Sequence, residues 1–150
     1  MGFRSFMDIA LSEAQAAAAL GEVPVGAVVV APDGTVVAKA GNRTRMLCDP
    51  TAHAEMLAIR AACAAAGADR LVDHDIYVTL EPCAMCAAAL SHARVRRLYF
   101  GAPDPKSGGT LHGARVFSHA QCHHAPEVYD GIDEARAAAL LRAFFAERRS

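Results

Sequence analysis

Strand-like and helix-like segments alternate along this chain, and that alternation limits its fold more than any other feature. The run "DIYVTL" at residues 75–80 is short, apolar and bounded, as expected of a buried strand. Pro82 follows at a position where a helix can begin, residues 83–93 suit that helix, and "RRLYFGA" at 96–102 favours the next strand. Strands separated by helices form a sheet that is covered on both faces and is at least partly parallel.

The flanking segments extend this pattern in both directions. Residues 3–20 favour a helix, a hairpin is predicted around a Pro-Asp-Gly turn, and a helix capped by Thr51 is predicted to run to about residue 66. A short strand at 127–132 and an amphipathic helix follow. With 150 residues, 53% of them hydrophobic, the chain suits one domain with its own core. We therefore predict a single α/β domain over residues 1–150, three-layered (α/β/α), with a mixed sheet of about five strands.

Charge and cysteine usage narrow the class of protein. The 15 basic and 16 acidic residues nearly balance, which argues against binding nucleic acid over the whole surface but permits a local basic patch. The apolar runs are far shorter than the roughly 20 residues of a membrane-spanning helix, and the N-terminus does not resemble a signal peptide. Five cysteines without a secretory signal are typical of reduced thiols. We expect a cytoplasmic protein with no membrane partner.

Cys83 and Cys86 are the first candidates for chemistry. Residues three apart on a helix share one face, so both sulfurs can reach one ion, and the positive end of the helix dipole favours thiolates there. Zn²⁺ prefers such ligands in a tetrahedral set, and His53, at the start of another helix, can supply a third. In open α/β sheets, ligands bind where such helix starts meet at one end of the sheet.

Three interpretations of this pair compete. A redox Cys-x-x-Cys pair fits the preceding strand but leaves His53 and Glu55 without a role. A structural zinc needs a fourth protein ligand, which other histidines or cysteines could offer. A catalytic zinc needs three protein ligands and a water, and Glu55 favours this interpretation. A carboxylate beside such a water can take its proton and deliver it to a leaving group, although the helix dipole alone also favours an acid in a first turn.

The two stretches together match a known signature. "HAE" at 53–55 followed by "PCAMC" at 82–86 has the H-x-E and P-C-x-x-C pattern of zinc-dependent nucleobase deaminases. With "EVPVGAVVV", "GNRT", "DPTAHAE", "YVTLEPCAMC", "FGAPDPKSG" and "LLRAFFAERR", nearly the whole chain resembles the bacterial tRNA-specific adenosine deaminases of the cytidine/deoxycytidylate deaminase superfamily. The resemblance implies a cytidine-deaminase-like fold and the hydrolysis of adenosine to inosine at the wobble position of a tRNA anticodon. It makes Glu55 the proton shuttle for a zinc-activated water and the histidine and two cysteines the ligands of one zinc.

The resemblance also implies how RNA would be held. Asn42 would contact the target base, Asp104 the neighbouring sugar and Lys106 a nearby phosphate. Phe145 and Arg149 would line the path of the anticodon loop, and the family works as a homodimer. From the residues alone, Asn42 is equally compatible with a turn, and Lys106 with ordinary solvated surface.

One segment departs from the family. Where relatives carry an Asn-His-Arg run before the last strand, this chain has His123, His124 and Ala125, so the RNA contacts of that loop are not carried over. Cys122 with His123 and His124 suggests a second metal site, but nothing near them in the sequence completes one.

Two other functions remain open. A zinc-dependent deaminase of a free base or nucleoside, of the guanine or cytosine type, shares the same core motifs. A non-catalytic zinc-binding partner subunit would need no proton shuttle, so an intact Glu55 argues against it. Two arginine clusters are compatible with RNA binding or with solvated faces: Arg94, Arg96 and Arg97, and Arg142, Arg148 and Arg149.

Overall fold

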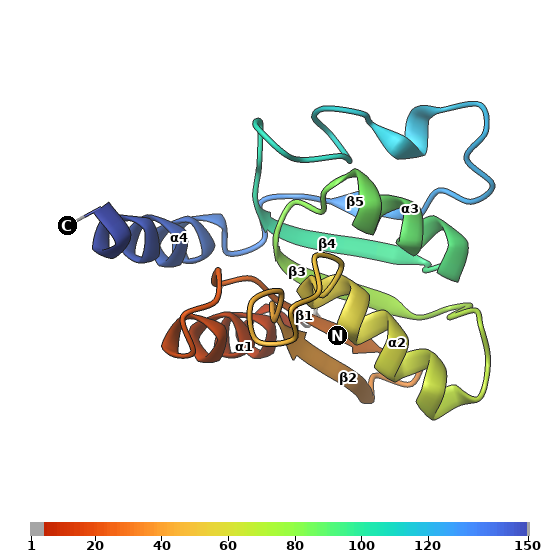
Figure 1. Ribbon diagram of the computed structural model, residues 1–150. Coiled ribbons are helices and arrows are strands. Elements are labelled where there is room, and N and C mark those ends of the chain that lie inside the picture. Colours follow the sequence, from red (N-terminus) through yellow and green to blue (C-terminus); the bar gives the residue numbers. More distant parts are fainter. Residues whose placement is uncertain (1–4, 150) are drawn as a thin grey trace.

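A mixed sheet lies between two layers of helices in the computed structural model, which describes residues 5–149 except for the side chain of Arg149 (Figure 1). Within that range the sheet has five strands in the order β2-β1-β3-β4-β5. β1 is antiparallel to β2 and β3, whereas β4 is parallel to β3 and to β5. The predicted three-layer α/β fold with a mixed sheet is confirmed. The strands are β1 (Gly26–Val30), β2 (Val36–Gly41), β3 (Asp75–Leu80), β4 (Arg97–Ala102) and β5 (Glu127–Tyr129).

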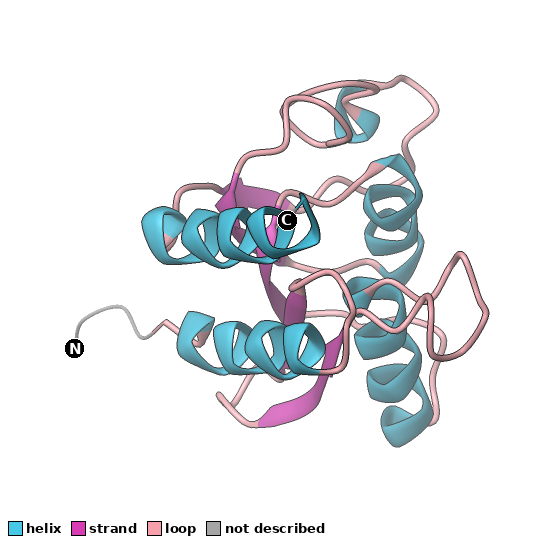
Figure 2. Ribbon diagram, turned by 60° about the vertical axis from the view of Figure 1, so that its left-hand side comes forward, coloured by secondary structure: helices cyan, strands magenta, loops and turns pink. Residues whose placement is uncertain are grey.

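Each face of the sheet carries its own apolar core, because successive side chains of a strand point to opposite faces. Val28 and Tyr77 pack in one buried cluster with residues of α1, whereas Val29 and Val78 pack in the other with residues of α2 and α3. Figure 2 shows the sheet nearly edge-on between the two helical layers. The helices are α1 (Met7–Ala19), α2 (Ala54–Ala66), α3 (Ala84–Ala93), α4 (Glu134–Arg149) and the short 3₁₀ helix η1 (Val116–Ser118).

The start of α2 differs from the sequence-based expectation. Thr51 was the predicted N-cap, but His53 occupies that position and α2 begins at Ala54. The Thr51 hydroxyl instead donates a 2.7 Å hydrogen bond to the carboxylate of Asp49, which stabilises a tight turn before the helix. His53 is therefore the N-cap residue of α2, and Cys83 has the same position in α3.

Most other boundaries lie within one residue of the prediction, but the first helix, predicted over residues 3–20, begins only at Met7. β3 has the predicted bounds, and α2 ends at Ala66 with Gly67 as its C-cap, whose φ of +63° favours glycine. The last strand is shorter than predicted and ends at Tyr129. All five cysteines are unpaired, as expected of reduced thiols. Among the helices of residues 5–149, none combines the length and apolar character needed to cross a membrane.

Candidate metal centre and active site

Three side chains from two helix starts converge at one end of the sheet. The Nδ1 atom of His53 lies 3.6 Å from Sγ of Cys83 and 3.5 Å from Sγ of Cys86. A tetrahedral zinc with Zn–N of about 2.0–2.1 Å and Zn–S of about 2.3 Å requires N···S separations of about 3.5 Å. Within residues 5–149, this is the only group of three or more His, Cys, Asp or Glu side chains close enough to hold a metal ion. The donor atoms and their spacing therefore fit zinc.

Hydrogen bonding within the group prepares the thiols for metal binding. Because Cys83 accepts a hydrogen bond from the Cys86 thiol, and also interacts with His53, the pKa of Cys83 falls to about 4. The same hydrogen bond to Cys83, together with burial, holds the pKa of Cys86 well above its usual value. The interaction with Cys83 also raises the pKa of His53. The three side chains thus share protons that a Zn²⁺ ion would displace, as expected of a thiolate-imidazole site.

Glu55 is the buried acid of this site. Glu55 is only 4% exposed, whereas an acidic residue in the first turn of a surface helix is ordinarily in contact with solvent. Burial raises the pKa of Glu55 to about 7, against the lowering effect of hydrogen bonds from its own backbone and from Cys86. A carboxyl group that titrates near neutral pH can both accept and release a proton, which is what a shuttle requires. This buried position, with Cys83, Cys86 and His53 close by, agrees with the prediction that Glu55 lies beside the metal ligands.

A pocket opens beside the metal ligands, and His53, Cys83 and Glu55 are among its lining residues. Residues from the loop before β1, the loop after β2, the start of α2, the end of β3 with the residues that follow it, and the loop after β4 form its walls. Its volume is about 230 Å³, below the roughly 300–1,000 Å³ of sites that bury drug-sized ligands, so it suits a single base rather than a whole nucleotide loop. The lining residues are Val23, Val25, Asn42, Thr44, His53, Ala54, Glu55, Leu80, Glu81, Cys83, Asp104 and Ser107.

Of the residues expected to contact RNA, Asn42 and Asp104 line the pocket, whereas Lys106 and Phe145 lie outside it. Asn42 is 7% exposed and Asp104 half-buried, and both line the pocket on different loops. Lys106 is exposed in the loop that carries Asp104. Phe145 is 43% exposed on α4, outside the pocket. Arg149 is the last residue of α4, and its side chain lies outside the described part of the structure.

Two buried carboxylates beside the pocket were missed by sequence reasoning. Glu22, after α1, accepts hydrogen bonds from the backbone nitrogens of Arg45 and Met46 at 3.1 and 2.8 Å. Glu81, between β3 and Cys83, has a fully buried side chain and accepts hydrogen bonds from the loop after β4. The only available signal was an acid directly after a buried strand and next to a metal-binding motif, because its partners lie more than 20 residues away.

Comparisons with known proteins agree with this geometry. Residues 3–102 match the model of the family described as the cytidine and deoxycytidylate deaminase zinc-binding region. The tRNA-specific adenosine deaminase of Agrobacterium fabrum is 58% identical over 144 residues, which cover 96% of this chain and 94% of that protein. The chain belongs to the bacterial tRNA-specific adenosine deaminases. The resemblance inferred from its motifs is confirmed.

Solved structures of related deaminases share the fold of this chain. A structure from a study of A-to-I editing by tRNA:A34 deaminases at the wobble position of transfer RNA has a TM-score of 0.89 at 58% identity, covering 91% of this chain and 98% of that one. The guanine deaminase of Bacillus subtilis has a TM-score of 0.65 at 38% identity, covering 69% of this chain and 66% of that one. The cytidine-deaminase-like fold is therefore confirmed, and of these two structures the one from the tRNA:A34 deaminase study has the higher identity and TM-score.

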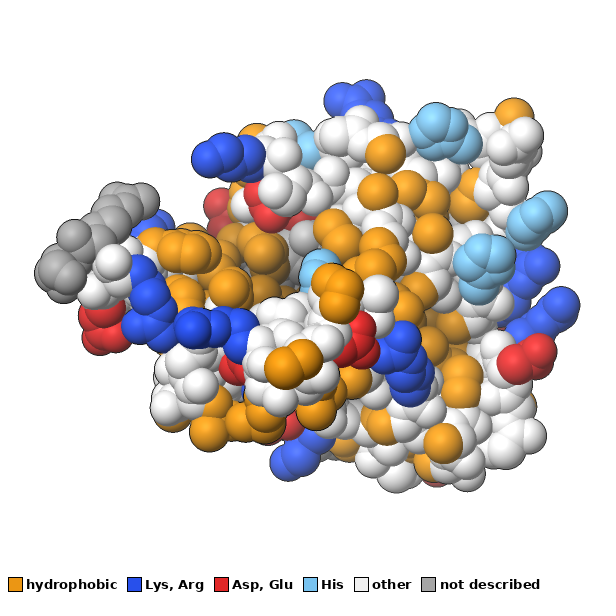
Figure 3. Space-filling view, in the orientation of Figure 1, with side chains coloured by type: hydrophobic (Ala, Val, Ile, Leu, Met, Phe, Trp, Pro, Cys, Tyr) orange, Lys and Arg blue, Asp and Glu red, His pale blue; other side chains and the backbone are white. Residues whose placement is uncertain are grey.

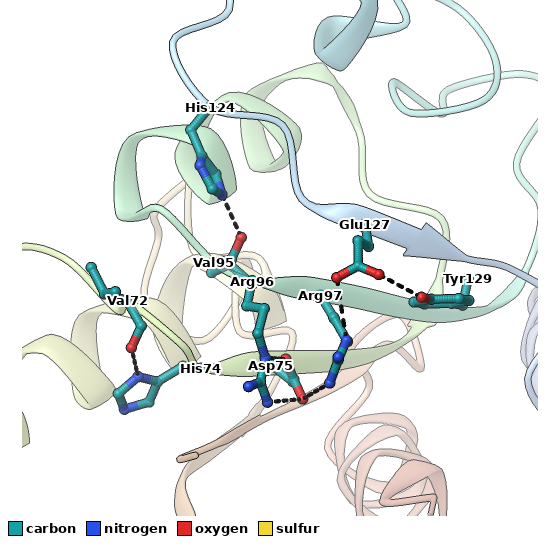
Figure 4. A network of polar contacts seen from close by, with 9 residues as sticks. All are labelled: Val72, His74, Asp75, Val95, Arg96, Arg97, His124, Glu127 and Tyr129. Atoms are coloured by element: carbon teal, nitrogen blue, oxygen red, sulfur yellow. Dashed lines mark hydrogen bonds and ion pairs between the residues drawn. The ribbon is translucent and has the colours of Figure 1, made fainter. Parts of the chain in front are cut away.

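One of the two predicted arginine clusters is paired with acidic side chains of the same chain. Arg96 makes two 3.0 Å hydrogen bonds to Asp75, and Arg97 lies 3.9 Å from Asp75 and 3.4 Å from Glu127 (Figure 4). Arg94 donates to a backbone carbonyl at 2.8 Å. This cluster stabilises the starts of β3, β4 and β5, so its charge is largely compensated within the chain.

Residues 122–125, which differ from the corresponding run of the family, pack against α3 and the residues before β4. His124 lies 2.7 Å from the carbonyl oxygen of Val95, and Cys122 lies 3.4 Å from the Ser91 hydroxyl (Figure 4 shows the His124 contact). Within the described residues, Cys122, His123 and His124 do not form a metal-binding group. Their contacts instead connect the segment before β5 to α3 and β4.

Proposed function

We propose that this chain hydrolyses adenosine to inosine at the wobble position of a tRNA anticodon. The convergence of His53, Cys83 and Cys86 beside the buried Glu55, at the floor of a base-sized pocket, carries this proposal. Membership of the bacterial tRNA-specific adenosine deaminases supplies the substrate class. A base that is turned out of an RNA loop can enter such a pocket and present its edges for recognition.

In this proposal, Glu55 moves protons between water and the leaving group. Bound zinc would act as a Lewis acid and make a water at the site more acidic. Because two thiolates would offset much of the ion's charge, a nearby base is needed, and Glu55 lies two residues from His53 with its carboxyl buried. Glu55 takes a proton from the water and delivers it to the exocyclic nitrogen of adenine. A C–O bond forms at C6, the C–N bond breaks and ammonia leaves.

Asn42 and Asp104 are suited to hold the target nucleotide. The amide nitrogen of Asn42 donates only a long 3.4 Å hydrogen bond to Thr44, so its donor and acceptor can serve a purine edge. Asp104, on another wall of the pocket, would accept a hydrogen bond from the sugar next to the base. Lys106 extends into solvent two residues further on and would contact a phosphate.

The path of the anticodon loop would follow basic side chains toward the C-terminal helix. On the face drawn in Figure 3, Lys and Arg side chains form a row that starts near the C-terminal end of the chain and runs toward the middle of the view. Arg45, in the loop after β2, donates a 3.3 Å hydrogen bond to the Gly21 carbonyl, and a Cβ on Gly21 would lie 3.6 Å from the Arg148 guanidinium. Gly21 therefore lies between Arg45 and Arg148 of α4, two residues from Val23 in the pocket wall. Phe145 on α4 offers an exposed ring on which a base could stack.

A substrate comparison tests the proposal. The purified chain, with its zinc content measured on the same sample, is offered an anticodon stem-loop, adenine, guanine and cytosine. We expect inosine to form in the stem-loop. Turnover of a free base without turnover of the stem-loop would instead support a free-base deaminase. Inactivity of the isolated, zinc-loaded chain on every substrate would support a non-catalytic partner subunit.

The remaining aspects of the proposal concern assembly and location. We propose that residues 1–150 act as a single deaminase domain, because both apolar cores of the described part share one sheet. The resemblance supports a homodimer, which light scattering at several protein concentrations tests. A cytoplasmic location agrees with free cysteines and a tRNA substrate.

A further inference from the structure

The Glu81 carboxylate forms hydrogen bonds with the loop that follows β4, and residues of this loop make up one wall of the pocket. Its side chain is 0% exposed, and the loop between β4 and η1 surrounds it. Oε1 accepts a 3.0 Å hydrogen bond from the backbone nitrogen of Asp104 and lies 2.7 Å from Nδ1 of His112. Oε2 accepts bonds of 3.0–3.2 Å from Thr110, Leu111 and His112: three from backbone nitrogens and one from the Thr110 hydroxyl. One carboxylate thus holds both ends of the segment 104–112.

This arrangement leaves Glu81 no capacity for proton transfer. A carboxylate offers about four lone-pair positions, and six donors already surround these two oxygens. A buried carboxylate with so many donors is expensive to disturb, because removing it leaves several N–H groups without an acceptor. Its role must therefore be sought in what it holds in place.

The segment that Glu81 holds carries substrate-facing residues. Asp104 and Ser107 line the pocket, and the Ser107 backbone nitrogen donates a 3.0 Å hydrogen bond to the Asp104 carboxylate. Gly108 passes so close that an added Cβ would lie 2.5 Å from Oε2 of Glu81 and 2.5 Å from the Asp104 carbonyl oxygen. On the other side, Glu81 is two residues from Cys83, and its backbone nitrogen donates 2.9 Å to Ala102.

We infer that Glu81 is a positioning residue that fixes Asp104 relative to the metal ligands and so sets how tightly the target nucleotide is held. This inference rests on the proposed function, in which Asp104 contacts the sugar beside the base. Small displacements of such contacts weaken catalysis strongly, because the bound geometry must place the reacting atoms together. Glu81 acts through Asp104 and not on the base itself.

The test uses the zinc-loaded, full chain and the variant Glu81→Gln. Gln keeps one acceptor oxygen but turns an NH₂ group toward N–H donors, so the segment 104–112 loses much of its anchor. We expect zinc content to be retained, KM for the anticodon stem-loop to rise by ~10- to 100-fold, and kcat to change less. A double-mutant cycle with Asp104→Ala should be strongly non-additive, because both substitutions remove the same contact.

Two further variants separate positioning from general destabilisation. Asp75→Asn also removes a largely buried carboxylate, but its partners Arg96 and Arg97 lie at the opposite end of β3, so we expect a lower melting temperature and additivity with Asp104→Ala (Figure 4). Thr110→Val removes one of the six donors' bonds and should raise KM by a smaller factor, about threefold, which keeps the test decisive if Glu81→Gln folds poorly. Additive effects of Glu81→Gln and Asp104→Ala, or an unchanged KM in both Glu81→Gln and Thr110→Val, would overturn the inference.

Hydrogen exchange distinguishes this inference from the proposed function. Glu81→Gln should speed amide exchange in residues 104–112 while leaving residues 43–49, whose anchor is Glu22, unchanged. Unchanged exchange in 104–112 overturns the positioning role even if the stem-loop is deaminated. A parent chain that turns over no stem-loop refutes the proposed function, and faster exchange confined to 104–112 would still support Glu81 as the residue that positions Asp104.

Discussion

The Nδ1 atom of His53 lies 3.5 Å from Sγ of Cys86, although 33 residues separate them in the chain. The contact joins the start of α2 to the first turn of α3, across the end of the sheet. Each partner is a ligand type that zinc prefers, and a bound ion would link the two helices. Metal binding and folding are therefore expected to be coupled.

Cys86→Ala should lose zinc and lower the melting temperature. Because a ligand that binds only the folded state stabilises it by about 4 kcal/mol at 1,000 times its Kd, we expect a decrease of roughly 10 °C relative to the zinc-loaded parent. Metal analysis and thermal unfolding of the same samples measure both effects. Cys48→Ser is the matched control, since Cys48 is exposed and is not a ligand. Zinc loss with unchanged melting would show that the metal does not stabilise the fold.

Glu55→Gln should keep zinc and lose activity. Gln has nearly the same shape but cannot take a proton from water, and general acid–base groups contribute roughly 10²–10⁴ in rate. Since the buried carboxyl has a pKa raised to about 7 by desolvation, replacing it with a neutral amide should not lower the melting temperature. Glu134→Gln, an exposed acid in the first turn of α4, is the control and should be fully active. Activity of Glu55→Gln within tenfold of the parent would exclude Glu55 as the shuttle.

Asn42→Ala should lower kcat/KM for the stem-loop by about tenfold, because one hydrogen bond to the base is worth roughly 1 kcal/mol or slightly more. Asn42→Asp keeps the shape and an acceptor but lacks the N–H donor, so it should be similarly impaired. Steady-state kinetics with zinc analysis measure this effect. If Asn42 serves only the backbone turn after β2, both variants would instead melt earlier and retain the parent kcat/KM.

Lys106→Ala should weaken RNA binding without changing zinc content. Removing one phosphate contact should reduce the slope of log K against log salt by about 0.7 to 1 unit, because one fewer counterion is released. Binding of the stem-loop at several salt concentrations measures the slope, with parent and variant converging at high salt. Lys39→Ala is the matched control, since Lys39 is the only other lysine and lies exposed on β2. Equal affinities of Lys106→Ala and the parent at every salt concentration would identify Lys106 as ordinary surface.

Local sequence determined the chemical identity of the site and much of the secondary structure. The ligand types of His53, Cys83 and Cys86, and the acid at Glu55, are visible as residue types at short spacing, because a zinc site needs particular donor atoms. The bounds of β3 were predictable because a continuous apolar run between polar residues has few alternatives, and Gly67 ended α2 as its φ requires.

Tertiary structure decided how those residues are supported. Thr51 does not cap α2 because Asp49 is a better-placed partner for its hydroxyl, and Arg96 and Arg97 are paired because folding brings Asp75 and Glu127 beside them. Glu81 is the clearest case: its partners begin 23 residues further along the chain, so no local pattern indicates that its carboxylate is buried among six donors. Short spacing shows which atoms a site can use. Burial and long-range hydrogen bonds, which exist only after folding, decide where those atoms are held.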